Sequence, residues 1–168
     1  IPLRLVGSEM CIRDRSIGFD HRVDLVVEDY RRRAQLGEVR SDAEPLAVLT
    51  AMRQIAAEFK LSAAQQLLSQ LHQQGHAVVL FSAFIAPLQL LHQRIGGELM
   101  TGRQRPLERQ QSVDRFQQGK SNCLLATYGT GSLGFTLHRA RHVVLLERPW
   151  TPGAVSYTHL TLPTIYSV

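Results

Sequence analysis

Residues 123–153 have the sequence CLLATYGTGSLGFTLHRARHVVLLERPWTPG, and this stretch decides the fold class. Two apolar runs rich in Val and Leu, one beginning at Cys123 and one ending at Glu147, predict buried strands. The short crossover between them predicts parallel strands in a sheet that is covered on both faces. Ligands of open α/β sheets bind at the carboxyl ends of such strands, where the glycine-rich turn lies.

The turn contains the small residues Gly129, Gly131, Ser132 and Gly134. Small residues let the backbone approach a ligand closely, and free N–H groups in such a turn can hold a phosphate. Glycines at this spacing also occur in ordinary turns that bind nothing. The turn by itself therefore leaves the choice between a phosphate site and a plain turn open.

The stretch resembles the C-terminal motor lobe of superfamily-2 helicases, most closely that of the Swi/Snf-related DNA translocases. That family has Ala-Gly-Gly-x-Gly-x-Asn-Leu after a strand that ends in Ser or Thr, followed by a hydrophobic strand, an acidic residue and Trp-Asn-Pro. Residues 130–137 (TGSLGFTL) take the first pattern and residues 147–152 (ERPWTP) the second, at the family's spacing. The chain departs from the family pattern at five positions: Thr130 replaces Ala, Ser132 replaces Gly, Thr136 replaces Asn, Glu147 replaces Asp and Thr151 replaces Asn.

The resemblance implies an α/β fold with a doubly wound parallel sheet, a RecA-like lobe that is incomplete here. It implies a fragment of an ATP-dependent double-stranded-DNA translocase, in which ATP and Mg²⁺ lie between two lobes and DNA lies across both. The first lobe's Gly-x-x-x-x-Gly-Lys-Ser/Thr and Asp-Glu-x-His motifs do not occur in this sequence. We therefore expect that the fragment contains no catalytic residue, binds no cofactor tightly and hydrolyses no ATP. Its expected partners are the missing first motor lobe and double-stranded DNA.

The resemblance also assigns roles to matching positions. The DNA-binding positions are Ser82, Thr127 and Gly131. The nucleotide-proximal positions are Gly134 and Thr136, and the coupling positions are Glu147 and Trp150. Arg109 would help to anchor the lobe. Without the resemblance, Glu147 could equally be a metal ligand or a base, and Trp150 a packing residue.

Two other functions stay open at this point. A nucleotide- or sugar-phosphate-binding half of a two-domain glycosyltransferase-like protein would share the strand, the glycine turn and the helix. It would not account for Trp150-Thr151-Pro152 at a fixed distance after the turn. An inactive RecA-like module that serves only in protein interaction would share the whole pattern.

The sequence from Pro45 onward alternates between helical and strand patterns, which indicates one doubly wound α/β domain over residues 45–153. Predicted helices cover 45–60, 62–75, 87–95 and 106–119, and predicted strands cover 77–81 and 98–101. Residues 16–44 form a charged lead-in with a predicted helix over 23–36. The run Tyr30-Arg31-Arg32-Arg33 in this helix fits either a DNA contact or a solvated helix face.

The two ends of the chain encode one DNA element in opposite orientations. Residues 10–15 can be encoded by ATGTGTATAAGAGACAGN, and the reverse complement of that DNA, read from its third base, encodes residues 155–159. The element resembles the adapter that transposase-based sequencing libraries attach to DNA fragments. We therefore expect residues 1–15 and 154–168 to be adapter-derived tails that make few contacts with the core.

Composition limits the class of protein further. The formal net charge is +5, carried by Arg far more than by Lys, which is compatible with a phosphate-backbone partner. Without the tails, Cys123 is the one remaining cysteine, so no disulfide framework is possible. We therefore expect the protein in the reducing cytoplasm, and at the nucleoid if the source is bacterial. No apolar run is long enough to span a bilayer. The histidines His72, His76, His92, His138 and His142 show no zinc-like spacing with cysteines or carboxylates. We therefore predict no metal site.

Overall fold

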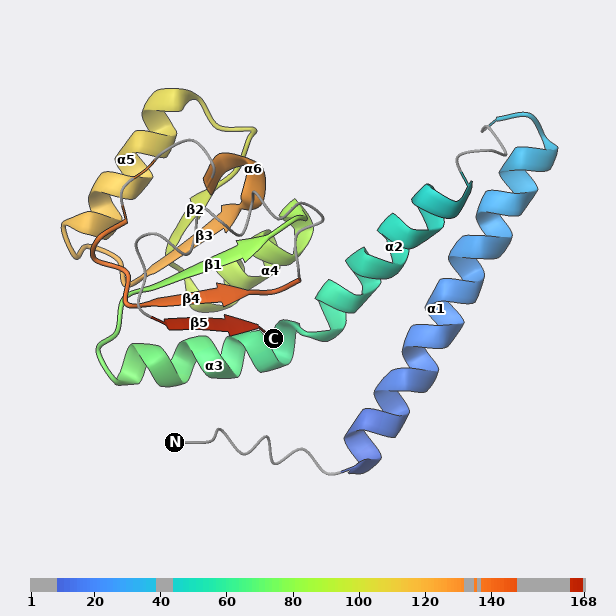
Figure 1. Cartoon of the computed structure of the whole chain (residues 1–168), viewed down its shortest axis with the longest axis horizontal. Helices are drawn as coiled ribbons and strands as arrows, with labels where there is room; N and C mark the ends of the chain where they lie inside the picture. The colour runs from blue at the N-terminus through green and yellow to red at the C-terminus, as the bar shows by residue number, and fades with distance from the viewer. Residues whose placement is uncertain (1–8, 39–43, 132–134, 136, 148–163, 168) are drawn as a thin grey trace. The chain divides into compact units, whose positions relative to one another are not determined.

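The computed structural model describes residues 9–38, 44–131, 135, 137–147 and 164–167 (Figure 1). The chain divides into two compact units, residues 1–59 and residues 60–168. The sequence placed the start of the α/β domain at Pro45, whereas the second compact unit begins at Lys60. The difference arises because residues 44–59 form a helix that packs on the lead-in helix of the first unit.

The first unit is a pair of helices, α1 (Glu9–Gln35) and α2 (Glu44–Phe59). Arg22 of α1 joins the two, because its Nη2 donates to Glu58 Oε2 at 2.7 Å and its guanidinium lies 5.9 Å from the centroid of the Phe59 ring. The helix predicted over 23–36 is present, but α1 begins much earlier, inside the segment assigned to the adapter. No proline interrupts residues 9–22, so nothing in this stretch stops the helix from extending.

The arginine run of α1 lies on an exposed face. Arg31, Arg32 and Arg33 are all exposed. Arg32 pairs with Asp29 at 2.5 Å, and Arg33 Nε donates to Glu38 Oε2 at 3.3 Å. These ion pairs within the helix surface favour the interpretation as a solvated face.

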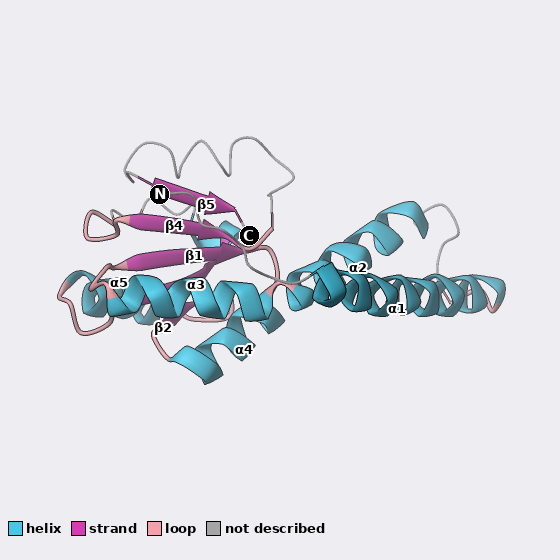
Figure 2. Cartoon of the chain, turned by 90° about the horizontal axis from the view of Figure 1, so that it is seen from below, coloured by secondary structure: helices cyan, strands magenta, loops and turns pink. Residues whose placement is uncertain are grey.

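The second unit contains a five-stranded sheet in the order β2-β3-β1-β4-β5, and all described pairs are parallel (Figure 2). The strands are β1 (Val78–Ser82), β2 (Glu98–Met100), β3 (Cys123–Thr127), β4 (His142–Leu145) and β5 (Thr164–Ser167). The two strands predicted on either side of the glycine turn are β3 and β4, and β1 lies between them. The predicted parallel arrangement is therefore confirmed.

Helices cover both faces of this sheet, which confirms the doubly wound fold. The helices are α3 (Leu61–Gln73), α4 (Ile85–Ile95), α5 (Pro106–Gln117) and the short α6 (Tyr128–Gly131). On one face, Val113 and Phe116 of α5 pack in a buried cluster with Val79, Phe81 and Leu124. The alternate residues of the strands face α3 and α4 on the other side. Figure 1 shows α5 and α3 on opposite sides of the strands.

The predicted Gly96–Gly97 loop between α4 and β2 has a clear steric cause. Gly97 has φ +97°, in the region that side chains rarely adopt. An added Cβ at this position would lie 2.9 Å from the carbonyl oxygen of Cys123. The loop therefore needs glycine to bring β2 beside β3.

The C-terminal tail contradicts one expectation. Residues 164–167 form β5 and pair with β4 over four residues, from His142↔Thr164 to Leu145↔Ser167. The expectation of few contacts is wrong for this segment, although β5 is an edge strand and not a central one. Thr-Ile-Tyr-Ser has high strand propensity, and an unpaired edge of β4 is a template for such a segment whatever its origin.

In the part of the chain that the structure describes, no helix is both long and apolar enough to cross a membrane.

Candidate functional site

Four strands of the sheet bring polar residues to one edge. Ser82 ends β1 and Thr127 ends β3, while Thr101 and Glu147 follow β2 and β4 within two residues. Because the strands are parallel, their carboxyl ends lie together, and Figure 1 shows the arrowheads pointing to the same side. Ser82 and Thr127 are direct partners in the register of β1 and β3. The structure thus brings together three of the residues that the sequence singled out.

Glu147 binds the end of β1 with both carboxylate oxygens. Ser82 Oγ donates to Glu147 Oε1 at 2.6 Å, and the Ala83 N–H donates to Oε2 at 3.1 Å. Ser82 is 0% exposed and Glu147 is 6% exposed, so this is a buried network. Ser82 Oγ also accepts from the Phe84 N–H at 3.0 Å, at the start of α4. Glu147 therefore fixes the turn from β1 into α4, and its carboxylate is engaged within the protein.

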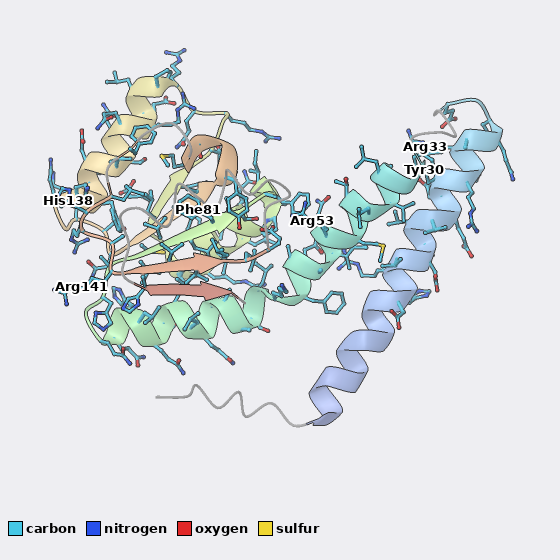
Figure 3. All side chains as sticks on the ribbon, viewed as in Figure 1. Tyr30, Arg33, Arg53, Phe81, His138 and Arg141 are labelled. Atoms are coloured by element: carbon cyan, nitrogen blue, oxygen red, sulfur yellow. The ribbon has the colours of Figure 1, made fainter. Side chains whose placement is uncertain are left out.

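Tyr128 links the same glutamate to the glycine turn. Its hydroxyl donates to the backbone carbonyl of Glu147, and its ring stacks on Phe81 with centroids 5.8 Å apart and planes at 15°. Phe81 is the last residue before Ser82, and Figure 3 labels it at the arrowhead end of the sheet. Sequence analysis missed Tyr128; the only signal was an aromatic residue directly after the strand that ends at Thr127.

Thr127 and Thr130 form a second polar pair at the end of β3. Their hydroxyl oxygens are 2.9 Å apart. Thr130 is 2% exposed, and its Oγ1 lies 3.1 Å from the Met100 carbonyl and 2.9 Å from the Thr127 carbonyl. Thr130 has one proton, and the two carbonyls can only accept it, so the Thr127 hydroxyl is the donor available to Thr130 Oγ1. Thr130, which stands where the related family has Ala, therefore holds the side chain of Thr127 in place.

Only part of the predicted glycine site lies within the described residues. Gly131 ends α6, and Gly129 in the same turn is exposed, with no atom within 4 Å of an added Cβ. The predicted nucleotide-proximal residues Gly134 and Thr136 and the predicted coupling residue Trp150 lie outside the described residues.

Positive charges flank this edge. Arg103 and Arg105 are exposed in the turn that follows β2. Gln104 holds that turn, because its Oε1 accepts from the Thr101 N–H at 2.9 Å and its Nε2 donates to the Leu99 carbonyl at 2.8 Å. Lys60 Nζ donates to the Leu146 carbonyl at 3.2 Å. Sequence analysis did not single out these cations, because only the sheet order brings the ends of β2 and β4 to the same edge as the glycine turn.

Arg109 lies on the inward face of α5, one turn before Val113. It is half-buried, and within the described part of the chain its buried Nε has no hydrogen-bond partner. Its anchoring role stays a prediction.

Metal-ligand clusters and the Cys123 thiol are the other groups that could carry chemistry. The described residues contain no group of three or more His, Cys, Asp or Glu side chains that could hold a metal ion. Burial raises the pKa of the Cys123 thiol to about 12, so the thiol is protonated at neutral pH.

An all-parallel sheet with helices on both faces and a polar edge at its carboxyl ends defines a doubly wound α/β lobe. Residues 60–161, more than half of the chain, match the family model described as "Helicase conserved C-terminal domain". The chain belongs to this family. The match begins at Lys60, where the second compact unit also begins. Membership of this family excludes the glycosyltransferase alternative.

Curated relatives include chromatin-remodelling factors. The chain is 32% identical over 102 residues to the CHD3-type chromatin-remodeling factor PICKLE of Arabidopsis thaliana, covering 56% of this chain and 7% of that protein. It is 33% identical over 127 residues to the human Chromodomain-helicase-DNA-binding protein 9, covering 70% of this chain and 4% of that protein. The chain therefore spans only a small fraction of the length of these relatives.

Solved structures show the same fold. The Sulfolobus solfataricus SWI2/SNF2 ATPase C-terminal domain superposes with a TM-score of 0.65 at 14% sequence identity, covering 93% of this chain and 75% of that chain. The core domain of a Sulfolobus solfataricus SWI2/SNF2 ATPase gives a TM-score of 0.67 at 13% identity, covering 92% of this chain and 37% of that chain.

Proposed function

We propose that this chain is the second motor lobe of an ATP-dependent double-stranded-DNA translocase of the Swi/Snf-related type. In this proposal, the carboxyl edge of the sheet contacts backbone phosphates of the DNA and borders the ATP cleft. The observation that carries it is the register of Ser82 with Thr127, which sets two hydroxyl residues side by side next to the glycine turn. Family membership and the exposed cations Arg103 and Arg105 support it.

Thr127 is the hydroxyl best placed to reach a phosphate. It is half-buried, whereas Ser82 is buried and bonded to Glu147. We propose that, when DNA binds, the Thr127 hydroxyl turns its one proton from Thr130 Oγ1 to a phosphate oxygen, and that the Gly131 backbone lies against the same strand. Ser82 would join the contact only if its hydroxyl exchanged Glu147 for a phosphate. Contacts of this kind position DNA without reading its sequence.

The proposed nucleotide side of the turn consists of Gly134 and Thr136. ATP, with Mg²⁺ bound by the first lobe, would supply the free energy for translocation. The exposed, unobstructed position at Gly129 fits a backbone that a phosphate approaches closely. Glu147 and Trp150 would couple the two sides, and the network of Glu147 with Ser82, Ala83 and Tyr128 supports this role for Glu147.

The partners in this proposal are double-stranded DNA and the first motor lobe of the same protein. The protein would accordingly lie in the compartment that holds the cell's DNA, which is the cytoplasm, at the nucleoid, if the source is bacterial.

The test is duplex binding by the purified chain. A fluorescein-labelled duplex of arbitrary sequence is titrated at two salt concentrations, and its anisotropy gives Kd. Thr127→Val keeps the shape and removes the hydroxyl, so Kd should rise about two- to tenfold, the value of one hydrogen bond. Gly131→Leu should weaken binding as well. Thr50→Val in α2 is the matched control, because the one partner of Thr50 Oγ1 among the described residues is the Leu46 carbonyl of its own helix.

The outcomes separate the proposal from its remaining alternative. Binding should be independent of sequence and weaken with added salt, because the contacts go to phosphates. Salt-dependent binding that Thr127→Val and Gly131→Leu leave unchanged would mean that the glycine turn is not the DNA contact. A chain that binds no duplex at low salt would favour the inactive interaction module.

A further inference from the structure

A polar cavity lies at the end of the sheet opposite to the glycine turn. It lies between the turn from α3 into β1 and the residues just before β4, and its volume is about 420 Å³. Its lining includes Gln74, His76, His138, Arg139 and Arg141, and no described lining residue is a carboxylate. Figure 3 shows His138 and Arg141 at the end of the sheet where β4 begins. The length of β1, roughly 16 Å at 3.3 Å per residue, separates this cavity from the glycine turn.

Arg139 is held rigidly at this cavity. Its Nη1 donates to the Phe116 carbonyl at 2.9 Å and to the Ser121 carbonyl at 2.7 Å, and its Nη2 donates to Asn122 Oδ1. The guanidinium also lies 5.6 Å from the centroid of the Phe116 ring. Three of its five N–H groups are used, and Nε–H and one Nη2–H have no partner within the described residues. A guanidinium fixed in this way binds an oxyanion at little cost in side-chain entropy.

The protonation of His138 follows from its neighbour. Gln117 Oε1 accepts from the Arg139 N–H at 3.2 Å, which fixes the orientation of the amide. Gln117 Nε2 therefore donates to His138 Nδ1, 3.0 Å away. The neutral imidazole must then carry its proton on Nε2, and the ring is exposed. His138 thus adds an Nε2–H donor beside the charge of Arg139.

Arg141 supplies a second positive charge. It is exposed, and its backbone N–H donates to the Ala77 carbonyl at 3.0 Å, which ties the residue to the start of β1. His76 packs edge-on against His142 with ring centroids 4.6 Å apart. Burial lowers the pKa of His142, and the charges of His76 and Arg141 lower it further, consistent with basic surroundings.

The helices at this edge limit the charge of the ligand. α3 and α5 both end here, and the partial negative charge of their last carbonyls opposes an anion. Arg139 offsets this effect at α5, since it binds the Phe116 carbonyl. These carbonyls oppose a doubly charged phosphate more than a singly charged carboxylate, so the guanidinium edge of Arg139, the imidazole N–H of His138 and the exposed Arg141 favour a carboxylate ligand.

We propose that this cavity binds carboxylate side chains of an acidic peptide segment on a partner protein. Arg139 and His138, which are held by hydrogen bonds, form one part of the site, and the exposed Arg141 adds the second positive charge. The site faces away from the proposed DNA edge, so a partner could bind here while the lobe holds a duplex. The proposal does not depend on the DNA contact of Thr127.

The test uses the full chain and two labelled peptides, one of alternating Glu and Gly and one of alternating Gln and Gly. The Glu peptide should bind more tightly than the Gln peptide and should shift the ¹H–¹⁵N signals of Arg139 Nε and of the Arg141 amide. Arg141→Gln should weaken Glu-peptide binding about fivefold or more. Arg94→Gln is the matched control, because Arg94 is also an exposed arginine near the end of a helix, in α4, and does not line the cavity.

Three results would overturn the proposal. Equal weakening by Arg141→Gln and Arg94→Gln would show that only the net charge matters. Signal shifts confined to residues 101–105 would place the peptide at the other edge. If inorganic phosphate bound at Arg139 and the Glu peptide did not, the ligand of the cavity would not be a carboxylate. Thermal unfolding of both variants verifies that neither substitution acts through loss of the fold.

Discussion

The hydrogen bond between Ser82 and Glu147 is the strongest test of how the carboxyl edge is built. Ser82→Ala removes the hydroxyl and leaves the rest of β1 unchanged. Glu147 Oε1 then loses the donor that lies 2.6 Å away, and the Phe84 N–H loses its acceptor at 3.0 Å. Ser82 is 0% exposed, so water cannot replace the hydroxyl without a rearrangement of the turn.

The expected loss of stability follows from these two bonds. A buried hydrogen bond to a charged group contributes about 1.5–3 kcal/mol, and a neutral one about 1 kcal/mol. The volume lost is a single oxygen atom, so cavity formation adds little. We expect Ser82→Ala to lower the free energy of unfolding of the second unit by about 2–4 kcal/mol.

The measurement must report on this unit alone, because the helix pair of residues 1–59 is a separate compact unit. Urea unfolding followed by the amide signals of β1 and β4 meets this need. Ser112→Ala is the matched control. Ser112 is also buried, at 2% exposure, but within the described residues its Oγ bonds only to Arg115 Nη2, from which it accepts at 3.2 Å, and Arg115 keeps its two bonds to Glu98.

Ser112→Ala should cost at most about 1 kcal/mol, since alanine also favours the helix. If both variants lost the same stability, or if Ser82→Ala lost less than about 1 kcal/mol, Glu147 would not depend on Ser82. The structural account of the coupling network would then be wrong at its central bond.

Two further predictions concern activity and the buried thiol. The purified chain should release no phosphate from ATP, with or without duplex DNA, because its sequence has neither Gly-x-x-x-x-Gly-Lys-Ser/Thr nor Asp-Glu-x-His. DNA-stimulated release by contaminant-free protein would refute the assignment to the second lobe. Burial raises the pKa of the Cys123 thiol from 9.0 to about 12, so in a Cys11→Ser background iodoacetamide should label Cys123 slowly at pH 8 and rapidly in urea. Because the folded pKa is the raised one, this thiol stabilises the fold below about pH 9, and the contribution is lost as the pH rises toward 12.

The elements of the second unit could be predicted because local signals agreed with the fold. Glycines and prolines marked the helix ends, and the apolar runs of β1, β3 and β4 are too short for helices. The start of α1 could not be predicted, because residues 9–22 have neither a strong stop nor a strong apolar period. β5 could not be predicted either, since its partner is the edge of β4, which no local pattern reveals.

The candidate site was predictable only where a motif carried it. Ser82, Thr127 and Glu147 came from matched positions, and the sheet register brings them to one edge. Tyr128 lies outside the motif and Thr130 stands where the motif has Ala, so the motif assigns neither of them a role. Their roles depend on contacts with Phe81, Glu147 and Met100. Such contacts join residues 19 to 47 positions apart, so only the folded chain reveals them.

The contacts of Glu147 also bear on how the proposed coupling could work. Its carboxylate binds the turn after β1, and its backbone carbonyl binds Tyr128 at the start of the glycine turn. A displacement of the glycine turn therefore acts on Glu147 through Tyr128, and a displacement of Glu147 acts on Ser82 through a buried bond that water does not weaken. The side chain of a glutamate is one methylene longer than that of the family's aspartate, which extends its reach toward Ser82 and Ala83. In this chain the proposed coupling of DNA to nucleotide would thus depend on three hydrogen bonds of one residue, and the Ser82→Ala measurement probes the most buried of them.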